Sequence, residues 1–203
     1  MTNDTYIGPR RRLPDFDYSD PTHVYFVTTC AQKDTAPFTD ERLAQVVIDA
    51  LTWLRAERDV RLYAYCLMPD HLHVLLQLGG SGRPLGAAIG AVKRFSTKAS
   101  WDMGYSGQLW QDRFYDHVMR TSEDGKRMAR YILENPVRRG LVWEAEMYPF
   151  SGTPDVLERG HVIRANEDGV GTGAYPSTRR RSAELRRLDV RQPPPLLVTA
   201  FPG

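Results

Sequence analysis

Apolar residues recur along this chain with two spacings, and the change from one to the other separates predicted helices from predicted strands. Between residues 43 and 54 they fall every three or four positions, which predicts an amphipathic helix over residues 40–58 with Thr39 as its N-cap. Two further helices are predicted at residues 84–99 and from Thr121 or Ser122 to Asn135, where the following proline disfavours the α conformation. Short runs rich in β-branched and aromatic residues predict strands at residues 23–30, 61–67, 71–78 and about 114–120.

The resulting order, β-α-β-β-α-β-α, predicts an α+β fold in which helices pack on an antiparallel sheet. A Pro-Asp turn at residues 69–70 joins the second and third strands, so these two are expected to form an antiparallel hairpin. Outside this pattern the chain is polar and rich in proline and arginine, with no apolar period. We therefore expect three parts: a basic N-terminal arm at residues 1–22, a folded domain at residues 23–150, and a mostly disordered basic tail at residues 151–203 with a short helix at residues 182–188.

Composition and charge narrow the class of protein. With 41% hydrophobic and 26% charged residues, and no apolar run near the ~20 residues of a membrane span, the chain is expected to be cytoplasmic and free of membrane contact. The net charge of +2 averages unlike regions, because basic residues gather at residues 83–98, 126–139 and 179–191. One such cluster is typical of a solvated helix face, whereas three favour a nucleic acid as partner and a place on the nucleoid.

Two histidines at the start of the third predicted strand are the first candidates for chemistry. His71 and His73 are separated by one residue, so in a strand their side chains point to the same face, while Leu72, Val74 and Leu76 point to the other. Two imidazoles within reach of one point in space are half of a site for a divalent metal ion.

Tyr131 and Asn135 are candidates for the second half of that site. They are spaced one helical turn apart and therefore share a face of the predicted helix. Alone, such a pair is more typical of a packed aromatic ring and an amide at a helix end. A tyrosine hydroxyl can nevertheless act as a nucleophile when a metal polarises its target, and the Asn oxygen is a hard ligand suited to Mg²⁺ or Mn²⁺.

Three segments of the chain resemble a known family. Residues 68–73, Met-Pro-Asp-His-Leu-His, resemble the histidine-hydrophobic-histidine (HUH) motif of the single-tyrosine, IS200-like transposases. Residues 131–142 resemble the nucleophile segment of their REP-associated subgroup, and residues 110–120 resemble the signature that links the two. The resemblance extends over about residues 8–150, in the right order and spacing. It implies a ferredoxin-like HUH endonuclease fold.

The resemblance also implies a reaction and the residues that carry it. His71 and His73 would bind Mg²⁺ or Mn²⁺, and Tyr131 would attack a phosphate of single-stranded DNA, leaving a 5′-phosphotyrosine and a free 3′-OH. Asn135 stands where the wider superfamily has a polar metal ligand that is often Gln. The substrate would be a short palindromic repeat, a REP element, that folds as a hairpin. Superfamily members act as dimers, whereas the subgroup is expected to act as a monomer.

Further residues are candidates for contacts around this centre. His117 and Gln111 lie in the linking signature and are candidates for metal or phosphate binding, although a hydrogen-bonded structural role is the alternative for each. Basic side chains near the motifs are expected to contact DNA phosphates. They are Arg10, Arg11, Arg12, Lys93, Arg94, Arg138 and Arg139.

Three functions are compatible with these residues. The first is a metal-dependent DNA strand transferase with Tyr131 as its nucleophile. The second is a domesticated relative that binds hairpin DNA without cutting it, and the third is a metal-dependent hydrolase that uses an activated water. The full set of His71, His73, Tyr131 and Asn135 favours the first.

Overall fold

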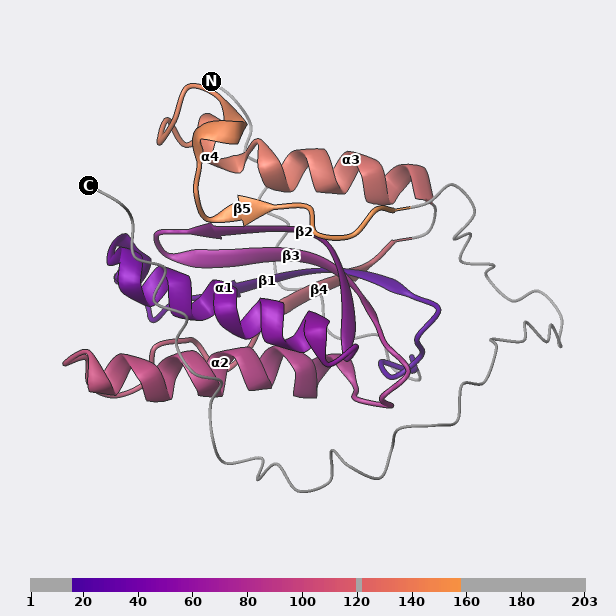
Figure 1. The fold of residues 1–203 in the computed structure, drawn as a ribbon, viewed down its shortest axis with the longest axis horizontal. Coiled ribbons are helices and arrows are strands. Elements are labelled where there is room, and N and C mark those ends of the chain that lie inside the picture. Colours follow the sequence, from indigo (N-terminus) through magenta and orange to yellow (C-terminus); the bar gives the residue numbers. More distant parts are fainter. Residues whose placement is uncertain (1–15, 120–121, 158–203) are drawn as a thin grey trace, which may run out of the picture. The chain divides into compact units, whose positions relative to one another are not determined.

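The computed structural model describes residues 16–119 and 122–157, which form a five-stranded antiparallel sheet with helices on both faces (Figure 1). The order of the strands across the sheet is β4-β1-β3-β2-β5. In chain order the elements are β1 (Val24–Cys30), η1 (Pro37–Thr39), α1 (Glu41–Ala56), β2 (Val60–Met68), β3 (His71–Leu78), α2 (Leu85–Asp102), β4 (Tyr115–Val118), α3 (Ser122–Leu133), α4 (Asn135–Arg138), η2 (Ala145–Met147) and β5 (Ser151–Gly152).

The first six regular elements follow the β-α-β-β-α-β order of a ferredoxin-like fold, and their strands lie in the order 4-1-3-2. This confirms the predicted α+β class and the predicted hairpin of β2 and β3, which pair antiparallel from Val60 opposite Leu78 to Met68 opposite His71. Because β3 lies between β1 and β2, all eight of its residues are buried. In the described part of the chain, no helix is long and apolar enough to cross a membrane.

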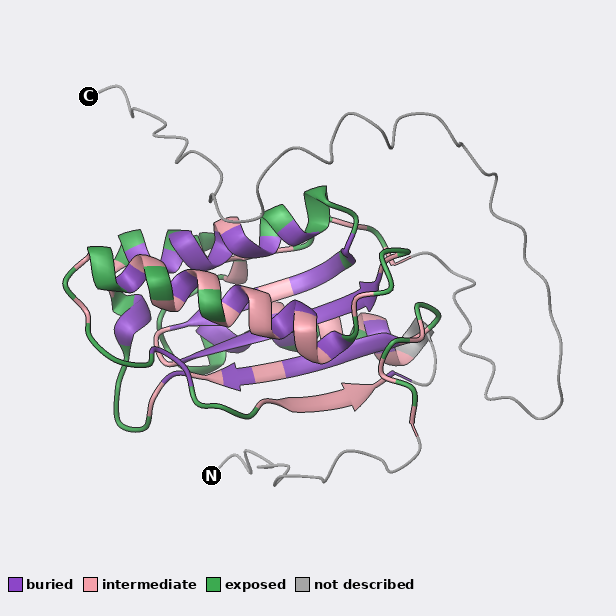
Figure 2. Cartoon of the chain, turned by 90° about the horizontal axis from the view of Figure 1, so that it is seen from below, coloured by how far each residue is buried: buried purple, intermediate pink, exposed green. Residues whose placement is uncertain are grey.

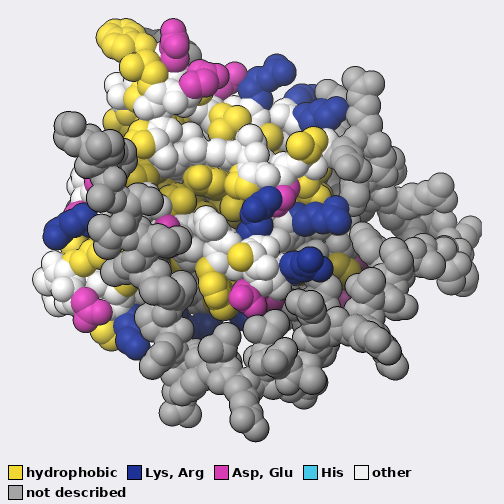
Figure 3. Space-filling view, in the orientation of Figure 1, with side chains coloured by type: hydrophobic (Ala, Val, Ile, Leu, Met, Phe, Trp, Pro, Cys, Tyr) yellow, Lys and Arg dark blue, Asp and Glu magenta, His cyan; other side chains and the backbone are white. Residues whose placement is uncertain are grey.

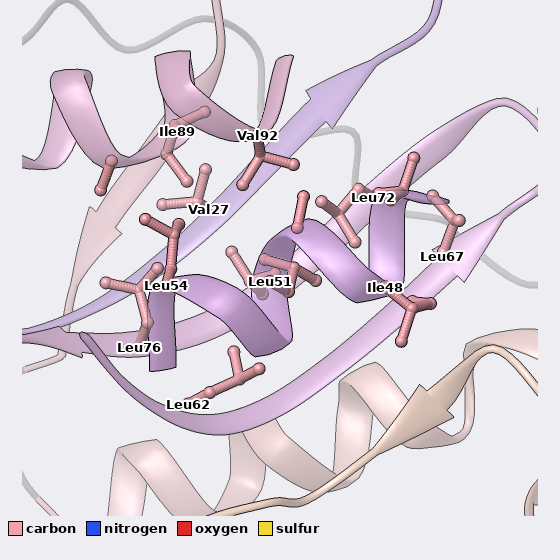
Figure 4. Packing of buried hydrophobic residues seen from close by; sticks show 14 of the residues in the cluster. Val27, Ile48, Leu51, Leu54, Leu62, Leu67, Leu72, Leu76, Ile89 and Val92 are labelled. Atoms are coloured by element: carbon pink, nitrogen blue, oxygen red, sulfur yellow. The ribbon is translucent and has the colours of Figure 1, made fainter. Parts of the chain in front are cut away.

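Alternation along the strands sends side chains to two separate cores. The larger core lies under α1 and α2, whose buried sides face the sheet and whose exposed sides face outward (Figure 2). In Figure 4, Ile48, Leu51 and Leu54 of α1 meet side chains of β1, β2 and β3 there. The smaller core lies on the other face, where Ile132 of α3 packs with Phe26 and Leu75. The sheet is thus covered on both faces, and the two cores define which face each strand residue occupies.

Helix ends depart from the predictions at two places. The N-cap of α1 is Asp40, whose carboxylate accepts a hydrogen bond from the backbone N–H of Arg42 at 3.0 Å, and Thr39 instead closes the short helix η1. The helix predicted to run to Asn135 ends at Leu133, and Asn135 begins α4. Pro136 does not stop the chain from being helical, because proline is tolerated in the first turn of a helix, where its missing N–H is not needed. The predicted cap at Thr121 lies outside the described residues.

Residues 148–157, which extend past the predicted end of the domain at residue 150, lie along the free edge of β2. Ser151 of β5 pairs with Cys66, and the hydroxyl of Tyr148 donates to the carbonyl of Leu67 at 2.8 Å. Further along, the carboxylate of Asp155 accepts the N–H of Leu62 at 2.8 Å and pairs with Arg55 of α1 at 2.7 Å. These contacts are part of the fold. Residues 1–15 of the predicted arm (residues 1–22), and the predicted tail and short helix beyond residue 157, lie outside the described residues.

Candidate functional site

The two histidines of the motif lie side by side on the face of the sheet that α3 covers. His71 and His73 are 7% and 8% exposed, and their Nε2 atoms are 3.1 Å apart. Leu72, Val74 and Leu76 belong to the core on the opposite face. The prediction that the two imidazoles project together is confirmed, because the two-residue period of a strand leaves them no other arrangement.

Besides the contact between their Nε2 atoms, each ring makes a hydrogen bond through Nδ1 that orients it. Nδ1 of His71 lies 2.6 Å from a carboxylate oxygen of Asp70, and Nδ1 of His73 lies 2.8 Å from the hydroxyl oxygen of Thr28. A carboxylate only accepts, so Nδ1 of His71 carries the proton and its Nε2 presents a lone pair. Partners of this kind are typical of metal-binding histidines, since they hold the ring in place and select its tautomer.

Burial favours the neutral form of both rings. Burial, with smaller contributions from the neighbouring His71 and the positive charges of Arg138 and Arg139, lowers the pKa of His73 to about 3. Burial also lowers the pKa of His71, although the carboxylate of Asp70 opposes that shift. A neutral imidazole is the form that binds a metal ion, so both rings are ready to act as ligands at neutral pH.

The spacing of the two Nε2 atoms fits a shared cation. Two ligands at about 2.1 Å from one octahedral cation, on adjacent corners, are about 3 Å apart, and the observed separation is 3.1 Å. Among the described residues no group of three His, Cys, Asp or Glu side chains comes together, so a third ligand from these residues would be of another type. Asn135 is one such residue: it is 6% exposed, and its buried Nδ2 has no hydrogen-bond partner in the described part of the chain. Turning this amide by 180° would exchange Nδ2 for the ligand atom Oδ1.

Tyr131 lies in the last turn of α3, beside the histidine pair. Its ring centre is 6.2 Å from that of His73 and 6.4 Å from that of Phe26, in edge-to-face contacts. Unlike the two histidines it is 39% exposed, so a long polymer can reach it. Arg138 of α4 lies over this ring. Its guanidinium carbon is 3.8 Å from the ring centre, and its Nη2 donates to the Tyr131 carbonyl at 2.9 Å. The structure thus brings Tyr131 and the two histidines together and adds a positive charge.

The other predicted site residues lie around this centre in different ways. His117 of β4 is paired with Phe26, so it is on the same sheet face as the histidine pair, but β1 separates it from β3. Gln111 donates through its side-chain Nε2 to the carbonyl of Ala31 at 2.8 Å. Lys93 is bound to three backbone carbonyls, those of residues 111–113, at 2.8 to 3.3 Å.

The structure describes three of the arginines predicted to contact DNA and leaves the other three outside the described residues. Arg94, Arg138 and Arg139 are exposed. Lys and Arg side chains are most frequent on the right half of the face in Figure 3, interleaved with Asp and Glu. Arg10, Arg11 and Arg12 lie outside the described residues. A phosphate contact stays a prediction for each of these side chains.

Two side chains that contact His73 or Tyr131 are not among the residues predicted from the sequence. Thr28 orients His73 because it stands directly opposite it in the β1–β3 ladder, and Phe26 stands two residues before Thr28 on the same face, against Tyr131. Their only signal in the sequence is the alternation of the first strand. That alternation does not tell which of its residues lies opposite which residue of β3, since the register depends on pairing across 45 residues.

The fold and the site together define a ferredoxin-like protein with a buried histidine pair and a neighbouring tyrosine at one face of the sheet. Comparison with known proteins agrees with this class. The pattern of the family described as "Transposase IS200 like" matches residues 21–135, more than half of the chain. The chain belongs to this IS200-like transposase family, which confirms the resemblance carried by its three segments.

Individual relatives place the chain near one branch of the family. A REP-associated tyrosine transposase of Escherichia coli K12 is 27% identical over 107 residues, a match that spans 53% of this chain and 62% of that protein, less than two thirds of its length. A Haemophilus influenzae protein described by the same term is 30% identical over 126 residues, spanning 49% of this chain and 71% of its own. A solved structure of a REP-associated tyrosine transposase bound to a REP hairpin superposes with a TM-score of 0.58 at 23% identity, covering 71% of this chain and 82% of that one. That likeness supports the fold.

Proposed function

We propose that this chain is a metal-dependent DNA strand transferase that cuts and rejoins single-stranded DNA beside hairpin-forming palindromic repeats. One observation carries the proposal: a partly exposed tyrosine ring stands 6.2 Å from one of two buried, neutral imidazoles whose Nε2 atoms converge. The relatives named above are transposases associated with such repeats, and the solved one is bound to a REP hairpin. These names support the choice of substrate.

His71 and His73 would hold Mg²⁺ or Mn²⁺, with the oxygen of Asn135 as a third protein ligand. When bound, such a cation polarises a phosphate and stabilises the negative charge that develops during attack. Asp70 and Thr28 keep the two rings oriented toward the shared point. The burial of the pair keeps both rings unprotonated, so no charge on the imidazoles opposes binding of the cation.

Tyr131 would be the nucleophile. Its hydroxyl gives up its proton as the oxygen forms a bond to phosphorus, the bond from phosphorus to the 3′ oxygen breaks, and that oxygen leaves as a 3′-OH with one proton. The product is a 5′-phosphotyrosine, in which the phosphodiester bond energy is kept. A free 3′-OH can then attack it in the reverse sense and join strands without ATP. Arg138 holds the ring of Tyr131 in position from the side of α4.

The flanking residues would bind the DNA strand. We propose that Arg94, Arg138 and Arg139 contact phosphates, and that the Arg10–Arg12 arm contacts the hairpin. The domain would then comprise residues 16–157, with the arm before it and the tail after it, and it would act as a monomer. Replacing Arg10, Arg11 and Arg12 with glutamine should weaken binding and reduce its salt dependence.

A covalent-adduct assay tests the proposal. The full chain is incubated with Mn²⁺ and a labelled hairpin oligonucleotide that carries single-stranded flanks, and protein–DNA adducts are separated under denaturing conditions. Tyr131→Phe should abolish the adduct, whereas Tyr105→Phe should leave it, because Tyr105 packs against the core on the other sheet face. Binding without any adduct would instead indicate the domesticated hairpin-binding protein, and cleavage that persists in Tyr131→Phe would indicate a hydrolase.

A further inference from the structure

A cleft of about 580 Å³ lies beside the histidine pair and has no role in the reaction described above. One wall is the loop at residues 30–36, which follows β1, and another is the turn at residues 68–70 between β2 and β3. Gln111, Arg139 and Leu141 complete the lining. Asp70 belongs both to this cleft and to the centre, because its carboxylate binds Nδ1 of His71 at 2.6 Å. Any molecule in the cleft therefore lies next to the proposed metal ligands.

The walls of the cleft are held together by backbone hydrogen bonds. The N–H of Ala31 donates to the carbonyl of Asp70 at 2.8 Å, and the N–H of Phe38 donates to the carbonyl of Pro69 at 3.1 Å. Gln111 is bound at both ends, through its backbone N–H to Cys30 and through its side chain to Ala31. The segment after β1 is thereby tied both to the β2–β3 turn and to Gln111. The cleft is preformed, as small-molecule sites usually are.

The lining combines apolar and polar surface in a way that suits a nucleobase. Ala36, Pro69 and Leu141 supply apolar surface, and Leu141 is 45% exposed, so a flat ring can lie against it. Gln32 and Gln111 present side-chain oxygens that can accept hydrogen bonds from the polar edge of a base, while their Nε2 groups donate to the backbone carbonyls of Trp110 and Ala31. Arg139 lines the same cleft and is exposed, so its guanidinium is available to a phosphate of a strand that lies there.

We infer that this cleft binds an unpaired nucleobase of the DNA strand, adjacent to the phosphate that Tyr131 attacks. The inference rests on the proposed function and deepens it, since it assigns a place where the enzyme positions the strand and reads one of its bases. Asp70 links the two places directly: it orients His71 on one side and lines the cleft on the other. A base held here would fix the position of its own phosphate relative to the metal ligands and Tyr131.

The test couples a change in the cleft to a change in the DNA. The parent protein is the full chain with Tyr131→Phe, so that binding is measured without cleavage. The probe is a hairpin oligonucleotide with single-stranded flanks, in which one unpaired base at a time is replaced by an abasic site. Ala36→Trp fills the cleft from its exposed loop, and Leu141→Ser removes part of its apolar wall. Ala56→Trp, at the exposed end of α1, is the matched control.

In the parent, one abasic position should weaken binding by about tenfold, the effect typical of losing one stacked base. Ala36→Trp should weaken binding of the intact oligonucleotide by a similar factor and should show no further loss at that abasic position. Leu141→Ser should show part of both effects, and Ala56→Trp should behave as the parent. The inference is overturned if Ala36→Trp and Leu141→Ser both keep the parent's affinity and abasic profile, or if the parent binds no oligonucleotide. Failure of the proposed function is a separate result, because it is the absence of a Tyr131-dependent adduct in the wild-type chain.

Discussion

The guanidinium of Arg138 lies 3.8 Å from the centre of the Tyr131 ring and donates to the carbonyl of the same residue at 2.9 Å. This arrangement joins the last turn of α3 to α4 across the break between the two helices. One side chain thus fixes both the ring that carries the proposed nucleophile and the backbone from which it projects.

Arg138→Met should therefore slow adduct formation more than it weakens DNA binding. Losing an exposed cation–π contact should lower the free energy of unfolding by only about 0.5–1 kcal/mol, while the tyrosine ring loses its fixed orientation. Single-turnover adduct rates at saturating oligonucleotide measure the first effect, and the dissociation constant of the Tyr131→Phe form measures the second. Arg42→Met at the start of α1 is the control. An unchanged rate in Arg138→Met at saturation would mean that Arg138 serves binding alone.

The burial of His73 predicts a dependence of stability on pH. Its pKa falls from an ordinary value near 6.5 to about 3 on folding, so between these values the unfolded chain binds more protons than the folded one. The free energy of unfolding is therefore highest above about pH 6.5. It decreases as pH falls toward 3, by at most about 1.4 kcal/mol per pH unit for one such histidine. Denaturant unfolding in EDTA from pH 7.5 to 4.5 should show this slope.

His73→Gln provides the comparison for that measurement, because glutamine does not titrate. The variant should be less stable at pH 7.5, yet its free energy of unfolding should fall less steeply with decreasing pH than that of the wild type. His71 contributes in the same direction, since burial lowers its pKa as well. Parallel curves for wild type and variant would show that His73 takes up a proton in the folded chain as readily as in the unfolded one.

The convergence of the two Nε2 atoms predicts that a divalent cation stabilises the fold. Mn²⁺ at 100 times its dissociation constant should add about 2.7 kcal/mol to the free energy of unfolding. His71→Gln and His73→Gln should each lose most of this gain. His117→Gln should keep the gain in stability. Because β1 lies between β4 and β3, these two strands are two spacings of about 4.8 Å apart. Loss of the Mn²⁺ effect in His117→Gln would instead make that residue a ligand.

The sequence allowed some parts of this site to be predicted and not others, for physical reasons. That His71 and His73 share a face follows from the period of a strand, which is local. That Thr28 orients His73 depends on the register between β1 and β3, which is set by pairing distant parts of the chain. Asn135 was predicted to end a helix because it precedes proline, yet it begins one. The rule on residues before proline is a preference, and Pro136 lies in the first turn of α4, where its missing N–H is not needed.

The last strand was not predicted because it has only two residues, too few for any alternation to be visible. Its contribution to stability should nevertheless be measurable. A chain ending at residue 150 loses β5, the ion pair of Arg55 with Asp155 and the acceptor of the Leu62 N–H, and it leaves the edge of β2 unpaired. It should unfold at a lower temperature than a chain ending at residue 157. Equal melting temperatures for the two would favour the predicted end of the domain at residue 150.

Lys93 offers the clearest separation between a structural role and a role in DNA binding. Its ammonium donates to the carbonyls of residues 111–113, and burial lowers its pKa. Lys93→Met would leave these carbonyls without their donor, which should cost about 1–3 kcal/mol of unfolding free energy. If Lys93 acts only here, the slope of log affinity for DNA against log salt concentration should not change. A phosphate contact would instead reduce that slope by about 0.7–0.9, the value for one neutralised phosphate. Lys98→Met, an exposed lysine on the same helix, is the control for stability.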